Sequence, residues 1–283
     1  MATGDKKKAV MQFDIDTASL SNDATRVPSS PLVKSALNFV PDTGNAGFHN
    51  CIYRGKALGS SVTAAQQAAI AAGTFDDMYI GDYWTINNKD WCIAHFDYWR
   101  SANTLSNRGV HHVVIVPKYY LARAKINSTA TTAGGYMGSD YYTGNNGNTS
   151  RADAQALIDA AFGSSHLFSH QKYLSSHVTD GIVDEVTSVT DSAAELMTET
   201  MLFGSSFFSS APGLEAGSDW QQLAIARLWP DFMSHGSSTW LRNVATDTKF
   251  CVYSYNSRPN ALNANASGSN DYFICPVFAI QYS

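Results

Sequence analysis

Apolar residues recur along this chain with two different spacings, which predict a mixture of helices and strands. Residues 62–72 (VTAAQQAAIAA) are rich in alanine, the best helix former, with Thr63 as N-cap and Gly73 as the stop. Residues 151–162 (RADAQALIDAAF) place their apolar side chains on one side of a helix. Both segments are therefore predicted to be helical, and the small apolar face of the first suits close packing against another helix.

Strand patterns lie between and after these helices. Apolar and aromatic residues at positions 75, 78, 80, 83, 84 and 86 lead to a turn at residues 87–90 (NNKD), which residues 91–96 (WCIAHF) follow. This pattern predicts a β-hairpin with aromatic cross-strand pairs. Residues 111–117 (HHVVIVP) are apolar enough for a central strand and end in proline. Further short strands are predicted over residues 238–242, 250–255 and 272–281.

A third helix is predicted over residues 191–203 (DSAAELMTETMLF), with Asp191 as its N-cap. The helices and strands do not alternate as β-α-β units, and no glycine-rich nucleotide-binding motif follows a strand. The pattern indicates an α+β fold with short antiparallel strands, two or three helices and long loops.

The first fifty residues differ from the rest because they combine prolines and turn residues with scattered apolar positions. Only residues 11–16 (MQFDID) alternate as a short strand does. Such a segment cannot build a core alone, so we expect it to lie on the main body or on a neighbouring subunit. We therefore expect an N-terminal arm and helix over residues 1–73, for attachment or oligomerisation, and a main domain over residues 74–283.

Composition and charge narrow the class of partner. Charged residues make up 15% of the chain and hydrophobic residues 44%, so a sizeable core is combined with a surface of Ser, Thr, Asn and Gly. The net charge is −5, and the one basic run, at residues 6–8, is short, which argues against nucleic-acid partners. The sequence has no signal-peptide pattern and no apolar run long enough to span a membrane, so we expect synthesis in the cytoplasm without membrane insertion.

Candidate chemical groups are dispersed. The four cysteines form no C-x-x-C pair, which favours reduced structural thiols over a zinc site or a disulfide framework. His166 and His170 are spaced to share a helical face, but the glutamate of H-E-x-x-H is missing; His111 and His112 would point to opposite faces of a strand. No catalytic residue, metal or cofactor is predicted, although Asp- and Asn-rich loops leave calcium open without a nameable ligand set.

Several ordered motifs resemble those of virion proteins from phages and prophages of Gram-positive gut bacteria. They lie at residues 50–56 (NCIYRGK), 58–60 (LGS), 73–84 (GTFDDMYIGDYW), 111–117 (HHVVIVP), 134–139 (GGYMGS), 162–167 (FGSSHL) and 196–199 (LMTE). Residues 240–242 (WLR) and 275–279 (CPVFA) are similar to a broader group of bacterial domains with the C-type-lectin-like fold, which includes formylglycine-generating enzymes and phage tropism determinants. The resemblance covers roughly residues 50–283.

This resemblance implies a C-type-lectin-like domain within the α+β class. The group usually carries an arginine before the final proline, where this chain has Cys275, so no role of that arginine is carried over. The oxygenase activity in the group needs a close pair of reactive thiols, whereas Cys251 and Cys275 are far apart in sequence and Cys275 lacks a basic neighbour. The resemblance therefore implies the fold and a virion location without an enzymatic activity.

Two polar, tyrosine-bearing segments are the candidate contact surface. Residues 253–273 read as a long loop between strands, and residues 136–150 as a second one. Tyrosine offers contact area at low entropic cost, and Ser and Asn adapt their hydrogen bonds, although either segment could be a plain connector. The candidate receptor-binding residues are Tyr253, Tyr255, Asn256, Arg258, Asn260, Asn263, Asn265, Asn270, Tyr272, Tyr141 and Tyr142.

Three functions are compatible with these observations. The first is a virion surface protein of a tail fibre or baseplate that binds a bacterial cell-surface glycan or protein, displayed as a homo-oligomer, expected to be a trimer, beside other virion proteins. The second is a structural head-decoration or baseplate component without a receptor. The third is an enzyme acting on cell-wall glycans, which no motif supports.

Overall fold

The computed structural model describes residues 46–100, 109–127, 132, 151–175, 178–179, 182–183, 186–209, 219–233, 238–255, 259–265 and 272–283. Residues 1–45 of the expected arm, with the short strand at residues 11–16, lie outside this part of the chain. The helical elements are α3 (Ala46–His49), α4 (Ala64–Ala72), α5 (Arg151–Phe162), η2 (Ser164–His166), α6 (Glu199–Phe203), α8 (Ala224–Leu228) and η3 (Pro230–Met233). The mixed α+β class is confirmed.

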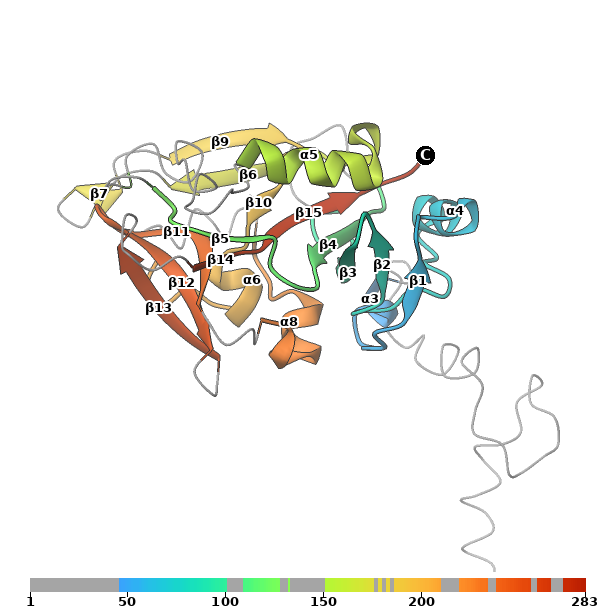
Figure 1. Cartoon of the computed structure of the whole chain (residues 1–283), viewed down its shortest axis with the longest axis horizontal. Coiled ribbons are helices and arrows are strands. Elements are labelled where there is room, and N and C mark those ends of the chain that lie inside the picture. The colour runs from blue at the N-terminus through green and yellow to red at the C-terminus, as the bar shows by residue number, and fades with distance from the viewer. Residues whose placement is uncertain are drawn as a thin grey trace, which may run out of the picture.

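A six-stranded sheet forms the centre of the body, in the order β1-β2-β3-β4-β15-β10 (Figure 1). Only the β1–β2 pair is parallel. β4 and β15 are buried along their whole length, because apolar residues cover both faces of these inner strands. The strands are β1 (Ala57–Gly59), β2 (Tyr83–Ile86), β3 (Lys89–Phe96), β4 (Val113–Pro117), β10 (Glu195–Leu196) and β15 (Pro276–Ile280).

The predicted aromatic hairpin is confirmed as β2 and β3. Its turn is tighter than expected, because Lys89 and Asp90 already belong to β3 and only two residues connect the strands. Asn87 and Asn88 both have left-handed backbones, with φ of 51° and 58°. Two-residue hairpin turns need this conformation, and asparagine tolerates it better than most residues. The cross-strand pairs include Trp84 with Trp91.

The predicted helix over residues 62–72 is confirmed as α4. Thr63 and Gln66 form a reciprocal capping box, and Gly73 ends the helix with φ of 68°. Ile70, with no exposed surface, belongs to the same hydrophobic core as the strands of the six-stranded sheet. Since β1 is also an edge strand of that sheet, the described residues before residue 74 share one folded body with the described residues after it.

A five-stranded sheet lies beside the first, in the order β13-β12-β11-β14-β5 (Figure 1). Its strands are β5 (Ala122–Ala124), β11 (Thr239–Thr246), β12 (Lys249–Tyr255), β13 (Pro259–Asn265) and β14 (Tyr272–Ile274). β13 corrects the expectation of a long loop over residues 253–273, because it pairs with β12 along seven consecutive positions. Backbone pairing with a neighbouring strand outweighs the low strand propensity of its Asn and Pro residues.

The helix predicted over residues 191–203 is mostly wrong. Asp191 ends strand β9 (Val186–Asp191), which pairs with β6 (His170–Ser175), and Glu195 starts β10, which pairs with β15. Only α6 is helical, with Thr198 as its N-cap accepting a hydrogen bond from the Met201 amide. Strand pairing with distant segments therefore overrides the local helical pattern. A further pair joins β7 (Val178–Thr179) and β8 (Ile182–Val183).

The predicted helix α5 is confirmed and packs on the six-stranded sheet. Phe162 at its end contacts three aromatic residues of the sheet edge-on or at a tilt, with ring centroids 5.4 to 6.3 Å apart: Trp84, Trp91 and Phe278. Within the described ranges, the helices are all too short or too polar to cross a membrane.

Candidate functional site

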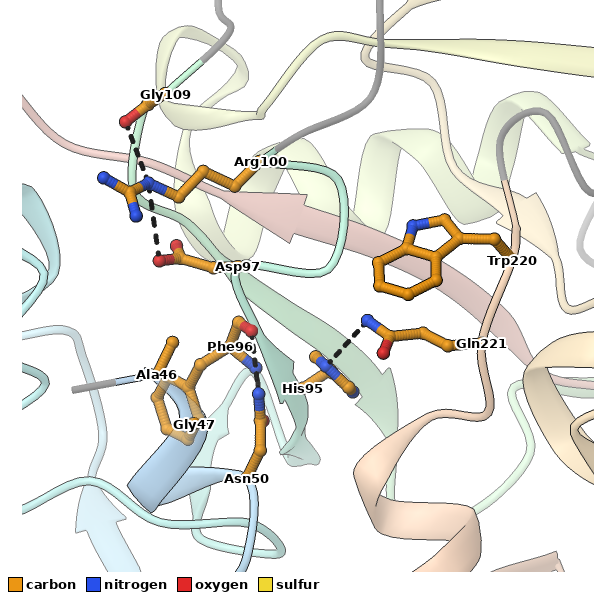
Figure 2. A pocket seen from close by; sticks show the side chains of 10 residues that line it. All are labelled: Ala46, Gly47, Asn50, His95, Phe96, Asp97, Arg100, Gly109, Trp220 and Gln221. Carbon is orange, nitrogen blue, oxygen red and sulfur yellow. Dashed lines mark hydrogen bonds and ion pairs between the residues drawn. The ribbon is translucent and has the colours of Figure 1, made fainter. Parts of the chain in front are cut away.

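A pocket opens beside the end of β3 and is lined by both charged and uncharged polar side chains. Its volume is about 420 Å³, within the range of small-molecule sites. Figure 2 shows Asp97 and Arg100 on one side, Trp220 and Gln221 on the other, and the α3 segment below. The full lining is Ala46, Gly47, Asn50, His95, Phe96, Asp97, Arg100, Gly109, Trp220 and Gln221.

His95 forms part of the wall between these sides. The β3–β4 register shifts between Ile93 and His95, and bulges of this kind reorient the side chains that follow. The Nδ1 atom of His95 accepts a hydrogen bond from the Ala224 amide at 3.0 Å, and its Nε2 lies 3.4 Å from the Gln221 amide nitrogen. Burial, together with the nearby Arg227 cation, lowers the pKa of His95 to about 3, so the ring is neutral.

Asp97 and Arg100 form the opposite wall. Asp97 has a left-handed backbone, with φ of 58°, and its carboxylate accepts from the His112 amide at 3.0 Å and from His111 Nδ1 at 2.7 Å. Burial raises the pKa of Asp97, and these two histidine contacts partly oppose the rise. Arg100 Nε donates to the Gly109 carbonyl at 3.1 Å and lies 3.8 Å from Asp97. The charges of this wall are therefore already balanced by protein partners.

Trp220 and Gln221 come from a segment that runs along the outside of the pocket. The Trp220 side chain is 53% exposed, unusually high for an indole. The backbone beside it is fixed, because the Gln221 carbonyl accepts the Tyr98 hydroxyl at 2.6 Å and the Leu223 amide donates to the Met201 carbonyl at 2.8 Å. An exposed aromatic face is thus presented on a held backbone.

Asn50 closes the pocket from below. Its side-chain amide forms two hydrogen bonds with the backbone of Phe96, as the backbone of a paired strand would. Nδ2 donates to the Phe96 carbonyl at 3.0 Å, and Oδ1 accepts from the Phe96 amide at 2.8 Å. Arg227 donates to the Asn50 carbonyl at 2.9 Å. The α3 segment is therefore attached firmly to the end of β3.

The residues predicted from sequence are not brought together at this pocket. Tyr253 is only 3% exposed and stacks on Phe203, so its assignment to the contact surface was wrong: it is a core residue. Tyr272 is half-buried, and its ring centroid lies 4.9 Å from that of Trp240.

The other predicted contact residues fall into two groups. Four lie on the backbone of the β12–β13 hairpin, which forms one edge of the five-stranded sheet. They are Tyr255, Asn260, Asn263 and Asn265. Five lie outside the described residues: Tyr141, Tyr142, Asn256, Arg258 and Asn270.

Neither histidine pair belongs to a metal-binding group among the described residues. His166 ends η2 and His170 begins β6, so their spacing does not place them on one helical face. Throughout the described ranges, His, Cys, Asp and Glu form no group of three suited to a metal ion.

The cysteines are free thiols. Cys92, Cys251 and Cys275 are buried as expected, whereas Cys51 is exposed. Burial raises the pKa of Cys92 to about 12, which makes that thiol unreactive.

Sequence reasoning missed the pocket because its residues come from four distant stretches of the chain. One signal was present: a single tryptophan, Trp220, stands within the polar run of residues 217–222 (GSDWQQ). A large aromatic residue without apolar neighbours is typical of an exposed contact residue. No family model, curated protein or solved structure matches this chain.

Proposed function

We propose that the chain is a phage virion surface protein that binds a bacterial cell-surface glycan, and that the pocket beside Trp220 is its sugar-binding site. The observation that carries this proposal is the exposed indole of Trp220 facing planar polar side chains across a cavity of about 420 Å³. A pocket of this size accommodates one or two sugar rings.

The chemistry of the lining suits a sugar. A pyranose ring has an apolar C–H face, which packs on an aromatic ring, and a rim of hydroxyls, which need both donors and acceptors. Trp220 supplies the aromatic face, and Gln221 and Arg100 supply planar hydrogen-bonding groups on facing walls. The Trp220 indole is partly exposed, so it can pack on one face of a sugar ring while the rest of the indole stays in water.

Contact, and not bond breaking, is the task that we assign to the pocket. Asp97 is held by His111 and His112, and the neutral ring of His95 is held by Ala224. A general acid or base has to exchange protons with a ligand, and these groups already direct their polar atoms at protein partners.

The finer fold assignment belongs to the same proposal. The segment that resembles lectin-like domains places Trp240 and Arg242 in the buried strand β11, while β15 is a buried inner strand of the main sheet. The C-type-lectin-like assignment is supported by the resemblance of residues 240–242 and 275–279. Display as a homo-oligomer, expected to be a trimer, would add avidity to single weak sites.

The test measures binding of the full chain to an array of bacterial surface glycans and to cells of candidate Gram-positive hosts. Replacing Trp220 with alanine should weaken glycan binding about 30-fold, as expected for an aromatic anchor worth about 2 kcal/mol. Tyr119→Ala is the matched control, because Tyr119 is 60% exposed and does not line the pocket.

The two variants separate the outcomes. Selective loss with Trp220→Ala supports the proposal. Equal binding by wild type and Trp220→Ala would move the receptor site away from this pocket, with the β12–β13 hairpin as the next surface to test. Absence of glycan and cell binding by the wild type would favour a structural virion role.

A further inference from the structure

A buried network of charges includes Asp219, the residue that precedes Trp220 in the chain. Its core is Arg242 on β11, which contacts Glu195 through Nη1 and Asp219 through Nη2. All three residues are at most 3% exposed. On the far side of Glu195, Lys172 lies 3.8 Å from its carboxylate and 2.8 Å from Asp191. Arg242 therefore bridges two carboxylates that have no access to water.

Arg242 is itself held in place. Its backbone amide donates to the Met197 carbonyl at 3.1 Å. Burial alone would raise the pKa of Glu195, but the Arg242 and Lys172 cations, with His170, outweigh burial and hold that pKa at about 2. Glu195 thus stays ionised, and one guanidinium edge remains fixed on it while the other faces Asp219.

Asp219 immediately precedes the exposed tryptophan. Its Oδ1 accepts from Trp99 Nε1 at 3.2 Å, and its Oδ2 receives Arg242. An ionised carboxylate without surface exposure is stable only beside a partner charge, since its desolvation costs several kcal/mol. The position of the Asp219 backbone therefore depends on the Arg242 cation, and Trp220 is one residue away.

The other end of the segment has independent anchors. Gln221 accepts from Tyr98, Gln222 Nε2 donates to the Leu202 carbonyl at 2.6 Å, and Ala224 donates to His95. These contacts fix the chain after Trp220, while Asp219 fixes it before Trp220. The indole is the exposed side chain between two held points.

We propose that Arg242, acting through the buried carboxylate of Asp219, is a positioning residue that holds the Trp220 indole over the pocket. The inference deepens the proposed function and rests on it, because it names what orients the aromatic face of the sugar site. Arg242 itself is 3% exposed and does not line the pocket, so we assign it no contact with the ligand.

The experiment measures acrylamide quenching of Trp220 fluorescence. The contribution of Trp220 is obtained by subtracting the signal of Trp220→Phe within each background. This subtraction is favourable because four of the other five tryptophans are at most 1% exposed and the fifth, Trp229, is half-buried. The four buried ones are Trp84, Trp91, Trp99 and Trp240.

Asp219→Asn is the decisive variant, because it keeps the shape of the side chain and removes the charge that Arg242 holds. Trp220 should then be quenched more strongly, with its emission shifted to the red. Arg242→Met should also increase the quenching of Trp220, provided that this variant folds. If it does not fold, the result for Asp219→Asn is the test of the proposal. Near-ultraviolet circular dichroism reports whether the buried aromatic residues keep their packing.

Lys172→Met is the matched control. It removes a buried cation from the same network, yet leaves Arg242 and both of its carboxylates in place. Wild-type quenching of Trp220 in this variant, with stronger quenching in Asp219→Asn, supports the proposal. A folded Asp219→Asn with wild-type quenching overturns it, as does equal quenching in Lys172→Met, which would indicate general loosening.

Failure of this inference can be told apart from failure of the proposed function. Quenching requires no ligand, so it tests positioning even if no glycan binds. Stronger quenching in Asp219→Asn, with glycan binding unchanged in Trp220→Ala, would reject the sugar site and keep the positioning role. Unchanged quenching in Asp219→Asn, with loss of binding in Trp220→Ala, would keep the sugar site and reject the positioning role of Arg242.

Discussion

Acidification should destabilise this protein strongly through its buried histidines. Burial, the largest cause in each case, lowers the pKa of His95 and of His112 to about 3. The usual value is about 6.5. When the pH falls below about 6.5, these histidines take up protons in the unfolded chain but stay neutral in the folded chain. Stability is therefore complete above about pH 6.5 and is lost as the pH falls toward 3.

The size of the loss follows from the difference in pKa. At about pH 5, each of the two rings costs about 2 kcal/mol, because about 1.5 pH units separate that pH from the unfolded pKa at about 1.4 kcal/mol per unit. Together they cost about 4 kcal/mol, a large part of the total stability of a typical domain, which is about 5–15 kcal/mol. His170, whose pKa burial also lowers, adds to the loss, whereas the raised pKa of Asp97 opposes it.

The assay is urea unfolding followed by fluorescence at about pH 7.5 and about pH 5. His95→Gln should reduce the difference between the two free energies of unfolding by about 2 kcal/mol, because glutamine can still accept from the Ala224 amide and does not titrate. His166→Gln, at a half-buried histidine beside Tyr282, is the matched control for the exchange of histidine for glutamine. Equal stability at both pH values would refute the reasoning.

Three further predictions concern stability and reactivity. Gly73→Ala should destabilise the chain by about 2 kcal/mol or more in thermal or urea unfolding, because φ is 68° and a Cβ would lie 2.2 Å from the His111 ring; equal stability would contradict the need for glycine there. Asp82→Asn should cost about 2 kcal/mol in the same assay, since this unexposed carboxylate accepts from Arg54 and from two backbone amides, and a loss below the error of the measurement would contradict that role. A thiol reagent should label Cys51 in the native protein within the time that it takes to label an exposed thiol, and the three buried cysteines only after unfolding; fast labelling of all four would show that the core opens readily.

Local sequence patterns were sufficient to predict an element where the segment itself contains the residues that begin and end it. The helix at α4 was predictable because Thr63 and Gly73 bound an alanine-rich run, and its capping box forms as such sequences allow. The hairpin turn was predictable because two asparagines accept left-handed backbones. In both cases the determining contacts lie within a few residues of one another.

Distant pairing explains what the sequence could not predict. Glu195 lies in a segment with a helical pattern, yet it pairs with Val277 on β15. Polar residues of β13 read as a loop, yet they pair with β12. Neither partner can be identified from local propensity, because the gain comes from completing a sheet.

The pocket could not be predicted from the sequence either, because it also depends on contacts between distant segments. Asn50, His95, Arg100 and Trp220 become neighbours only when α3, the end of β3 and the segment before α8 meet. The predicted contact residue Tyr253 showed the opposite error, since a tyrosine in a polar context was needed to fill the core beside Phe203.

The most direct test of the central claim is a crystal structure of the full chain with a saccharide identified on the glycan array. We expect a sugar ring packed on the Trp220 indole, with its hydroxyls within hydrogen-bond distance of Gln221 or Arg100. A saccharide bound at the β12–β13 hairpin, or anywhere else with Trp220 uncovered, would contradict it.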